Sequence, residues 1–256
     1  MQKLTLIKVG GQIVEEPETL QKLLSDFAKI EGYKVLVHGG GRAATRIAAQ
    51  LGIESQMVNG RRITDKKMLE VVTMVYGGLV NKQIVAGLQA LNVNALGLTG
   101  ADLNYMRSDK RPVKEVDYGF VGDVKTVDTA ILADLIAKNA VPVLAPLTHD
   151  KKGNLLNTNA DTIAAEAAKA LAKYFDITLV FCFEKKGVLR NPDDEESVIP
   201  EITETLFNQY VADGTIQGGM IPKLENSFDA IRAGVKQVVI TKADEIWKNS
   251  GTVVVQ

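Results

Sequence analysis

The sequence predicts an α/β fold with a largely parallel β-sheet covered by helices on both faces. Short apolar runs recur along the chain without the alternation of a half-exposed strand, and stretches with helical periodicity separate them. Parallel strands are buried on both faces, and consecutive ones need a crossover that is usually a helix. A length of 256 residues with 46% hydrophobic side chains provides a core for one such unit or for two lobes.

Each expected strand is an apolar run bounded by polar or turn residues. These runs occupy residues 4–9, 34–37, 95–98, 141–144, 177–183 and 238–240. The helices between them carry apolar residues on one face at 3.6-residue spacing, and the clearest such stripe consists of Leu20, Leu23, Leu24, Phe27 and Ile30. These residues are assigned to the core, with no functional role.

A longer helical pattern covers about residues 64–91. Thr64 or Asp65 is expected to cap its N-terminus, because both residue types accept hydrogen bonds from the first free N–H groups. Gly77 and Gly78 fall in its middle, where glycine costs stability. Close packing against another helix or subunit is the expected compensation.

The rest of the chain divides without a proline-rich linker or a repeat. Residues 103–127 have the short alternating runs and turn residues of β-hairpins and are expected to form a flap above the sheet edge. Residues 168–176 are expected to join two lobes of a single domain, residues 1–174 and 175–256. Residues 191–197, with consecutive acids after a proline, predict a solvated loop.

Charge and cysteine content exclude several classes of protein. Thirty basic against 31 acidic side chains give a net charge of -1, so no overall basic field attracts nucleic acid. The single cysteine, Cys182, excludes an internal disulfide and fits a reducing compartment. The chain enters a strand-like run at once, without a signal peptide, and its longest uncharged stretch, residues 83–101, is interrupted by polar residues and glycines. We therefore expect a cytoplasmic protein with no membrane or nucleic-acid partner.

Three segments place a cation or a glycine turn where an anion would bind. They are Lys8 before Gly10 and Gly11, the run from Gly39 through Gly40 and Gly41 to Arg42, and Lys223 after Gly218 and Gly219. Glycines let backbone N–H groups approach phosphate oxygens, and a nearby ammonium group supplies the opposite charge. Together the segments predict an enzyme that acts on phosphoryl groups.

The motif VHGGGR follows an expected strand and opens an expected helix, which predicts a phosphate cradle. Gly39, Gly41 and Ala44 also match the weak dinucleotide fingerprint G-x-G-x-x-A, which requires an acidic residue about 20 positions later. The sequence has NGRRIT in that region, basic where an acid is needed. The phosphate loop with G-K-[ST] is absent from the sequence.

Basic and polar residues elsewhere have both a structural and a functional interpretation. Asn59 and Gly60 predict a hairpin turn, and Arg61 or Arg62 beside it is either solvated or holds a carboxylate substrate. The segment NTNAD, which ends at Asp161, is either an ordinary helix cap or the source of a carboxylate that orients lysines.

His38 and His149 are interpreted as structural, because neither has the spacing partners of a zinc site or a catalytic triad. No metal-binding side chains are predicted. A scarcity of histidine is no obstacle when the nucleophile is a carboxylate, since its reference pKa of about 4.3 leaves it ionised at neutral pH. Such a reaction needs positioning and charge neutralisation.

The motifs IKVGG, VHGGGR, NGRRIT, YGFVGDV, NLLNTNAD and GGMIPKLE occur in the order and spacing of the acetylglutamate kinases. Over nearly its whole length the chain therefore resembles this branch of the amino-acid-kinase family. The resemblance implies a three-layer αβα sandwich with a mainly parallel central sheet, of the carbamate-kinase-like type. It also implies that ATP with Mg²⁺ phosphorylates the γ-carboxylate of N-acetyl-L-glutamate in arginine biosynthesis.

The resemblance also assigns roles to individual residues. Lys8 and Lys223 resemble the pair that stabilises the transferring phosphoryl group, and Asp161 the carboxylate that holds both lysines. Gly11, Gly40 and Gly41 would donate N–H groups to the phosphoryl group. Arg62 and Asn157 resemble the residues that grip the carboxylate and main-chain-like groups of the substrate. The expected substrate-binding residues are therefore Gly40, Gly41, Arg62 and Asn157. The expected nucleotide-binding residues are Gly10, Gly11, Glu184, Lys186, Gly187, Thr215 and Gln217.

The sequence departs from the family after the fifth strand, where Phe183, Glu184, Lys185, Lys186 and Gly187 replace a common pattern of a hydroxyl residue, an aspartate and a small residue. The acyl group stays open between acetyl and succinyl, because some bacteria use a succinyl group in this pathway. Other interpretations are a different kinase of the same fold and a non-catalytic amino-acid sensor. Without the extra N-terminal helix of arginine-inhibited hexamers, an arginine-insensitive homodimer is expected.

Overall fold

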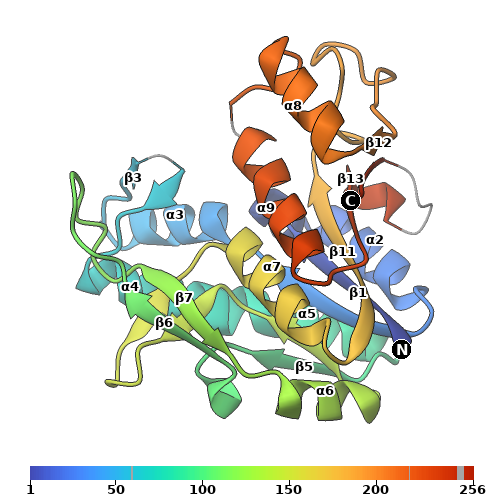
Figure 1. Cartoon of the computed structure of the whole chain (residues 1–256). Coiled ribbons are helices and arrows are strands. Elements are labelled where there is room, and N and C mark those ends of the chain that lie inside the picture. The colour runs from blue at the N-terminus through green and yellow to red at the C-terminus, as the bar shows by residue number, and fades with distance from the viewer. Residues whose placement is uncertain (59, 219, 247–250) are drawn as a thin grey trace.

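The computed structural model describes residues 1–58, 60–218, 220–246 and 251–256 (Figure 1). The sequence-based expectations for Asn59 and Gly219 therefore fall outside the described residues. Within the described ranges, an eight-stranded sheet is the largest element, with strand order β12-β14-β13-β11-β1-β2-β8-β5. In that order the strands are Glu201–Ile202, Thr252–Val254, Gln237–Lys242, Phe175–Phe183, Gln2–Val9, Tyr33–His38, Val141–Leu144 and Ala95–Leu98.

The sheet from β13 to β5 is parallel throughout, as predicted. Each pair in this part of the sheet is parallel, and β14 joins β13 antiparallel at one end. The apolar runs match the strands because both faces of a parallel sheet are buried, so its strands are apolar along their whole length. In the centre, Lys8 of β1 lies between Val37 of β2 and Phe181 of β11, so it stands at the carboxyl end of all three strands.

Helices cover both faces of this sheet, which confirms the three-layer αβα sandwich. Leu4 and Leu6 point into one apolar core, whereas Ile7 and Val9 point into the other. The first core is closed by α6 (Ala130–Ala137), α7 (Ala160–Leu171), α8 (Glu204–Ala212) and α9 (Met220–Arg232). The second is closed by α1 (Gly11–Glu15), α2 (Pro17–Ala28), α3 (Gly41–Gln50), α4 (Lys66–Val72), η1 (Thr73–Val80) and α5 (Asn81–Ala90).

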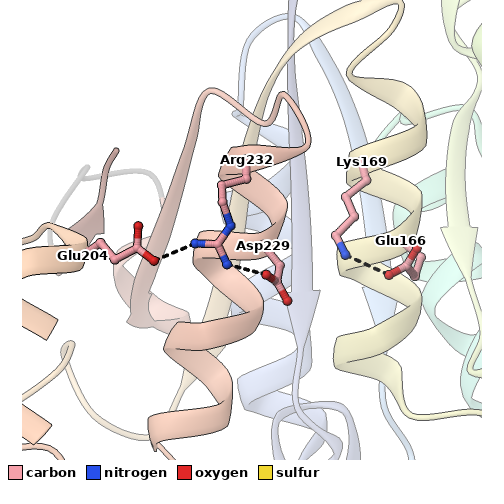
Figure 2. A network of polar contacts seen from close by, with 5 residues as sticks. All are labelled: Glu166, Lys169, Glu204, Asp229 and Arg232. Carbon is pink, nitrogen blue, oxygen red and sulfur yellow. Dashed lines mark hydrogen bonds and ion pairs between the residues drawn. The ribbon is translucent and has the colours of Figure 1, made fainter. Parts of the chain in front are cut away.

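Helices α7 and α9 lie side by side in front of the central strands (Figure 1). Ion pairs on this side of the molecule are shown in Figure 2. Arg232 of α9 pairs with Glu204 of α8 at 2.8 Å and with Asp229 at 2.5 Å, and Lys169 of α7 pairs with Glu166 at 2.9 Å. Exposed pairs of this kind contribute about 0–1 kcal/mol each, so the apolar faces hold these helices in place.

The long helical pattern forms one continuous helix with a π-helical centre at Thr73–Val80. Asp65 is its cap, since its carboxylate accepts the N–H of Met68 at 2.8 Å. By length and composition alone Lys66–Ala90 could cross a membrane, but its inner side chains, including Ile84 and Leu88, belong to the second core. A buried helix of a globular protein has the same composition.

The expected close packing of another helix on Gly77 and Gly78 is not what the structure has. A methyl group at Gly77 would meet the side chain of Leu147 at 3.4 Å, an ordinary contact. At Gly78 a methyl group would meet no atom within 4 Å. Among the described residues neither glycine therefore brings another helix close, and the alternative expectation of packing against another subunit stays a prediction.

Residues 103–127 do contain a hairpin, formed by β6 (Met106–Lys110) and β7 (Gly122–Val127). They join β9 (Leu147–His149) and β10 (Leu155–Asn157) in a four-stranded sheet. Strands β3 (Met57–Val58) and β4 (Arg61–Arg62) form a separate antiparallel pair around the predicted turn. Short 3-10 turns lie at Asp102–Asn104 (η2) and Ala243–Glu245 (η3).

The expected joint between the lobes is mostly regular structure. Helix α7 continues to Leu171, and β11 begins at Phe175. Strand β11 pairs with β1 along seven of its residues, from Phe175 to Phe181, so one sheet runs across the proposed boundary. Division into lobes at residue 174 stays a prediction.

Candidate active site

Two neighbouring cavities open at the carboxyl ends of the central strands, beside the glycine turns. The first has a volume of about 160 Å³ and is lined by Gly39, Gly40, Gly41, Met57, Gly60, Arg61, Arg62, Tyr76, Val121, Pro146, Asn157, Thr158, Asn159 and Ala160. The second has a volume of about 440 Å³ and is lined by Lys8, Gly10, Gly11, Gln12, Ile13, Gly41, Arg42, Cys182, Phe183, Glu184, Lys185, Gly187 and Met220. Because Gly41 lines both, the two cavities adjoin there.

Lys8 and Asp161 form an ion pair beside this junction. The ammonium nitrogen of Lys8 lies 2.7 Å from a carboxylate oxygen of Asp161, and the side chains are 12% and 30% exposed. Strand β1 delivers the lysine, and the first turn of α7 delivers the aspartate. The positive end of the α7 dipole favours a carboxylate at that position. The predicted contact between these residues, 153 positions apart in the chain, is therefore present.

Lys223 approaches the same pair from α9. Burial lowers the pKa of Lys223 to about 8; the charge of Asp161 acts in the opposite direction, and that of Lys8 lowers it further. Its ammonium nitrogen lies 3.0 Å from the centre of the Phe183 ring, where the negative face of the ring attracts a cation. The expected role of Asp161 in holding both lysines is present for Lys8 and stays a prediction for Lys223.

The two glycine turns pack backbone against backbone. A methyl group at Gly11 would lie 3.2 Å from the nitrogen of Gly41 and 3.3 Å from that of Gly40. One at Gly39 would lie 3.0 Å from the nitrogen of Gly11. Side chains here would separate the turns and cover their N–H groups. Because α3 begins at Gly41, its first N–H groups lack partners within the helix and carry partial positive charge towards the junction.

Arg62 anchors one wall of the first cavity. It is buried and donates to the carbonyl of Gly41 at 2.7 Å, to the hydroxyl of Thr45 at 2.9 Å and to the hydroxyl of Ser55. Burial raises the pKa of Tyr76, although the charge of Arg62 and a hydrogen bond to it act in the opposite direction, so the phenol stays protonated. The guanidinium group is thereby held rigidly at the cavity.

Asn157 reaches the same cavity from β10. Its amide nitrogen donates to the hydroxyl of Thr64 at 2.9 Å, and this hydroxyl donates to the carbonyl of Arg62 at 3.0 Å. Asn159 caps α7 by accepting the N–H groups of Asp161 and Thr162, as an ordinary helix cap does. The NTNAD segment therefore fits both interpretations, with Asn159 as the helix cap and Asp161 as the carboxylate that pairs with Lys8.

Comparison with protein-family models matches residues 3–242 to the amino acid kinase family. The chain belongs to this family. It is 75% identical over 252 residues to the acetylglutamate kinase of Parabacteroides distasonis, with 98% of this chain and 99% of that protein covered. It is 74% identical over 251 residues to the acetylglutamate kinase of Bacteroides thetaiotaomicron, with 98% of each covered.

Solved structures share the fold of this chain. The structure of smu.665 from Streptococcus mutans covers 98% of both chains with a TM-score of 0.78 and 29% identity. The carbamate kinase of Giardia lamblia, bound to AMP-PNP, covers 100% of this chain and 98% of its own with a TM-score of 0.70. At 15% identity the second likeness shows the fold alone.

In this member of the amino acid kinase family, the predicted nucleotide residues divide into two groups. Gly10, Gly11, Glu184 and Gly187 line the second cavity. The remaining three do not line either cavity. Lys186 pairs with Glu196, the N–H of Thr215 donates to Asp213 at 2.9 Å, and the Gln217 amide donates to the Gly214 carbonyl. For all seven residues nucleotide binding stays a prediction, and for these three the cavities give it no support.

Tyr76, Cys182 and Phe183 are among the cavity-lining residues that were not identified as site residues from the sequence. Tyr76 sits on the apolar side of a helix, where an aromatic residue is usually core. Cys182 is the penultimate residue of a buried strand, and Phe183 ends that strand. The departure from the family pattern after the fifth strand was the one available signal for Phe183. It did not indicate that Lys223, 40 positions later, would lie on the ring.

Proposed function

We propose that this protein transfers the γ-phosphoryl group of ATP to the γ-carboxylate of N-acetyl-L-glutamate, a step of arginine biosynthesis. The observation that carries the proposal is full-length identity of 72–75% to proteins named acetylglutamate kinase. The two adjoining cavities support it. An acceptor in the first and a nucleotide in the second would meet at Gly41, beside the ammonium of Lys8.

The reaction forms one bond and breaks another. A γ-carboxylate oxygen attacks the γ-phosphorus, the bond from this phosphorus to the oxygen bridging to the β-phosphorus breaks, and ADP leaves with that electron pair. The product is an acyl phosphate. No proton is removed, because the carboxylate is already ionised at neutral pH. The protein therefore has to align the two reactants and neutralise charge in the transition state.

In this proposal Lys8 and Lys223 neutralise the transferring phosphoryl group, and Asp161 fixes the position of Lys8. The N–H groups of Gly11, Gly40 and Gly41 donate to phosphoryl oxygens. Their close packing is what supports this role. Arg62 and Asn157 hold the acceptor in the first cavity, and both are fixed by neighbouring hydroxyl groups.

Mg²⁺ is expected to enter this site bound to the phosphates of ATP. Among the described residues no cluster of three or more His, Cys, Asp or Glu side chains is arranged to hold a metal ion. Mg²⁺ commonly keeps several waters and binds through substrate phosphates, so a dedicated protein site is not required. When bound, the ion supplies positive charge to the β- and γ-phosphates. Chelation by EDTA is expected to abolish turnover, and added Mg²⁺ to restore it.

The test is a coupled assay of ADP release with four acceptors: N-acetylglutamate, N-succinylglutamate, glutamate and aspartate. Turnover with N-acetylglutamate and none with the unacylated amino acids supports the proposal. Turnover with glutamate or aspartate alone points to another kinase of the same fold. Tight binding of an acylglutamate without ADP release points to a sensor.

N-succinylglutamate is a second candidate acceptor. Arg61 and Arg62 both line the first cavity, and a succinyl group adds a third carboxylate that a second guanidinium group could pair with. Burial lowers the pKa of Arg61, and the charge of Arg111 lowers it further. The surroundings therefore disfavour the charged guanidinium group, and a carboxylate of the substrate would stabilise it. A higher kcat/KM for N-succinylglutamate than for N-acetylglutamate would identify it as the substrate.

We also propose that the protein works in the cytoplasm as a homodimer, with a first lobe, residues 1–174, for the acceptor and a second, 175–256, for the nucleotide. Met74 and Leu79 of the π-helical stretch are 54% and 41% exposed, an apolar surface that suits a second copy. Light scattering after size exclusion tests the dimer. A monomer or a stable hexamer would contradict it.

A further inference from the structure

His38 lies immediately before the glycine turn of α3, at the end of β2, and is fully buried. Its Nδ1 atom is 2.7 Å from the carbonyl oxygen of Gly39. Its Nε2 atom is 3.1 Å from the amide nitrogen of Asn81, which also donates to the carbonyl of Val143 at 2.9 Å. Since Asn81 Nδ2 can only donate, Nε2 accepts, and Nδ1 carries the hydrogen that Gly39 accepts.

The surroundings of His38 keep it neutral. Burial lowers its pKa to about 4; the hydrogen bond to Gly39 acts in the opposite direction, and the charge of Lys82 lowers it further. Lys82 in turn donates to the side-chain oxygen of Asn81 at 3.1 Å, which orients the amide with its nitrogen towards the histidine. Asn81 and Lys82 therefore fix His38 as the tautomer with hydrogen on Nδ1, and neither of these two residues lines a cavity.

The carbonyl that His38 holds belongs to the same peptide unit as the N–H of Gly40. No cis peptide bond occurs among the described residues, and in a planar trans peptide the C=O and N–H bonds point in opposite directions. Fixing the Gly39 carbonyl towards His38 therefore directs the Gly40 N–H away from it. In the described part of the chain no backbone carbonyl accepts a hydrogen bond from this N–H.

A second contact fixes the other end of Gly39. Its N–H donates to the carbonyl of Val9 at 3.0 Å, so both backbone groups of this glycine are held. Glycine has more backbone freedom than any other residue, and without these contacts the peptide could rotate. The nitrogen of Gly40 lies 3.3 Å from the position that a side chain at Gly11 would occupy.

We propose that His38 is a positioning residue for phosphoryl transfer: through the Gly39 carbonyl it aims the N–H of Gly40 at the junction of the two cavities. The inference rests on the proposed kinase function and adds a residue that touches neither substrate. Donors that are fixed before the reaction need no reorganisation in the transition state, which is where such hydrogen bonds are most effective.

Two substitutions separate this role from a general contribution to packing. In His38→Asn the amide nitrogen takes the place of Nδ1 and can still donate to Gly39. In His38→Gln the amide group takes the place of Nε2, so it keeps the Asn81 contact and loses the Gly39 contact. We expect kcat to fall roughly ten- to hundredfold in His38→Gln and by less than about threefold in His38→Asn, with KM for ATP changed little in both.

Equal losses of kcat in the two variants, or full kcat in His38→Gln, would overturn the proposal. Melting temperatures of both variants show whether a loss merely follows stability. The tautomer itself is measured on the unmodified protein by ¹⁵N NMR of the imidazoles. The chain has two histidines, so His149→Gln assigns the signals.

We expect His38 to be the Nδ1–H tautomer and not to titrate between pH 6 and 9. An Nε2–H tautomer, or titration in that range, would contradict the proposal whatever the variants do. The spectrum does not depend on turnover. A wild-type protein that fails to phosphorylate any acylglutamate would therefore refute the proposed function without affecting the measured tautomer.

Discussion

The contact between Lys223 and Phe183 is the feature of the site that depends most on single residues. The ring of Phe183 receives the ammonium group of a lysine whose pKa burial lowers to about 8. An unpaired ammonium is costly to bury, and the ring face compensates part of that cost. Lys223 is thus held within reach of the charges of Asp161 and Lys8 without a nucleotide.

The pKa of Lys223 predicts the pH above which kcat/KM for ATP declines. Lys223 is protonated below about pH 8 and loses its charge as the pH rises through that value, so kcat/KM for ATP should be level below about pH 7 and fall above pH 8. A pH profile measured at low ATP reports the free enzyme. In Lys223→Arg the guanidinium group stays charged, so the decline should disappear even if the overall rate is lower. A decline that persists unchanged in Lys223→Arg would assign it to another group.

At the scale of elements, the glycine turns after β1 and β2 depend on close backbone approach. Gly11→Ala would place a methyl group 3.2 Å from the nitrogen of Gly41, among the N–H groups proposed to bind phosphoryl oxygens. Loss of one such donor costs roughly a hundredfold or more in kcat. Gly78→Ala is the comparison, because its methyl group meets no atom within 4 Å and Gly78 lines neither cavity, so this change should cost far less. Similar kcat values for the two variants in the coupled assay would remove these N–H groups from the mechanism.

The cap of the long helix offers a test that is separate from activity. Asp65→Ala removes the acceptor of the Met68 N–H, and a lost cap costs about 1 kcal/mol. Asp65→Asn keeps an acceptor and should change the free energy of unfolding by a few tenths of a kcal/mol at most. Urea denaturation measures both. Equal destabilisation by the two substitutions would mean that charge, and not the cap, is responsible.

Sequence patterns predicted the elements that local chemistry determines. The runs at 95–98 and 141–144 coincide with β5 and β8, because buried parallel strands are apolar along their whole length. The π-helical stretch was not predicted, since its apolar spacing within a longer helix resembles that of an α-helix. The short strands β9 and β10 were also missed, because they form through partners in the flap.

In the site, too, residues with a local signature were predicted, and contacts between distant segments were not. Lys8 and the glycine turns stand out because a cation and glycines at a strand end have few structural explanations. The link from Asn157 through Thr64 to Arg62 joins two distant segments and has no signature in either of them. Geometry of that kind becomes visible only when the chain is folded.

At the scale of the whole molecule, a single sheet joins the segments that carry the two cavities. Because β11 pairs with β1 across the proposed lobe boundary, we expect one cooperative thermal transition by circular dichroism and calorimetry. ATP and the acceptor should each raise that one melting temperature, since each binds the folded state alone. Two resolved transitions, with each ligand shifting a different one, would show that the lobes unfold independently.

The shared wall at Gly41 has a consequence for inhibitor chemistry. A ligand of the first cavity and a ligand of the second could be joined by a short linker into one inhibitor. An acylated amino acid joined through a chain of phosphates to a nucleoside would pass over the glycine turn and fill both compartments at once. Such a conjugate avoids the entropy of bringing a second molecule to the protein, so its affinity should far exceed that of either half.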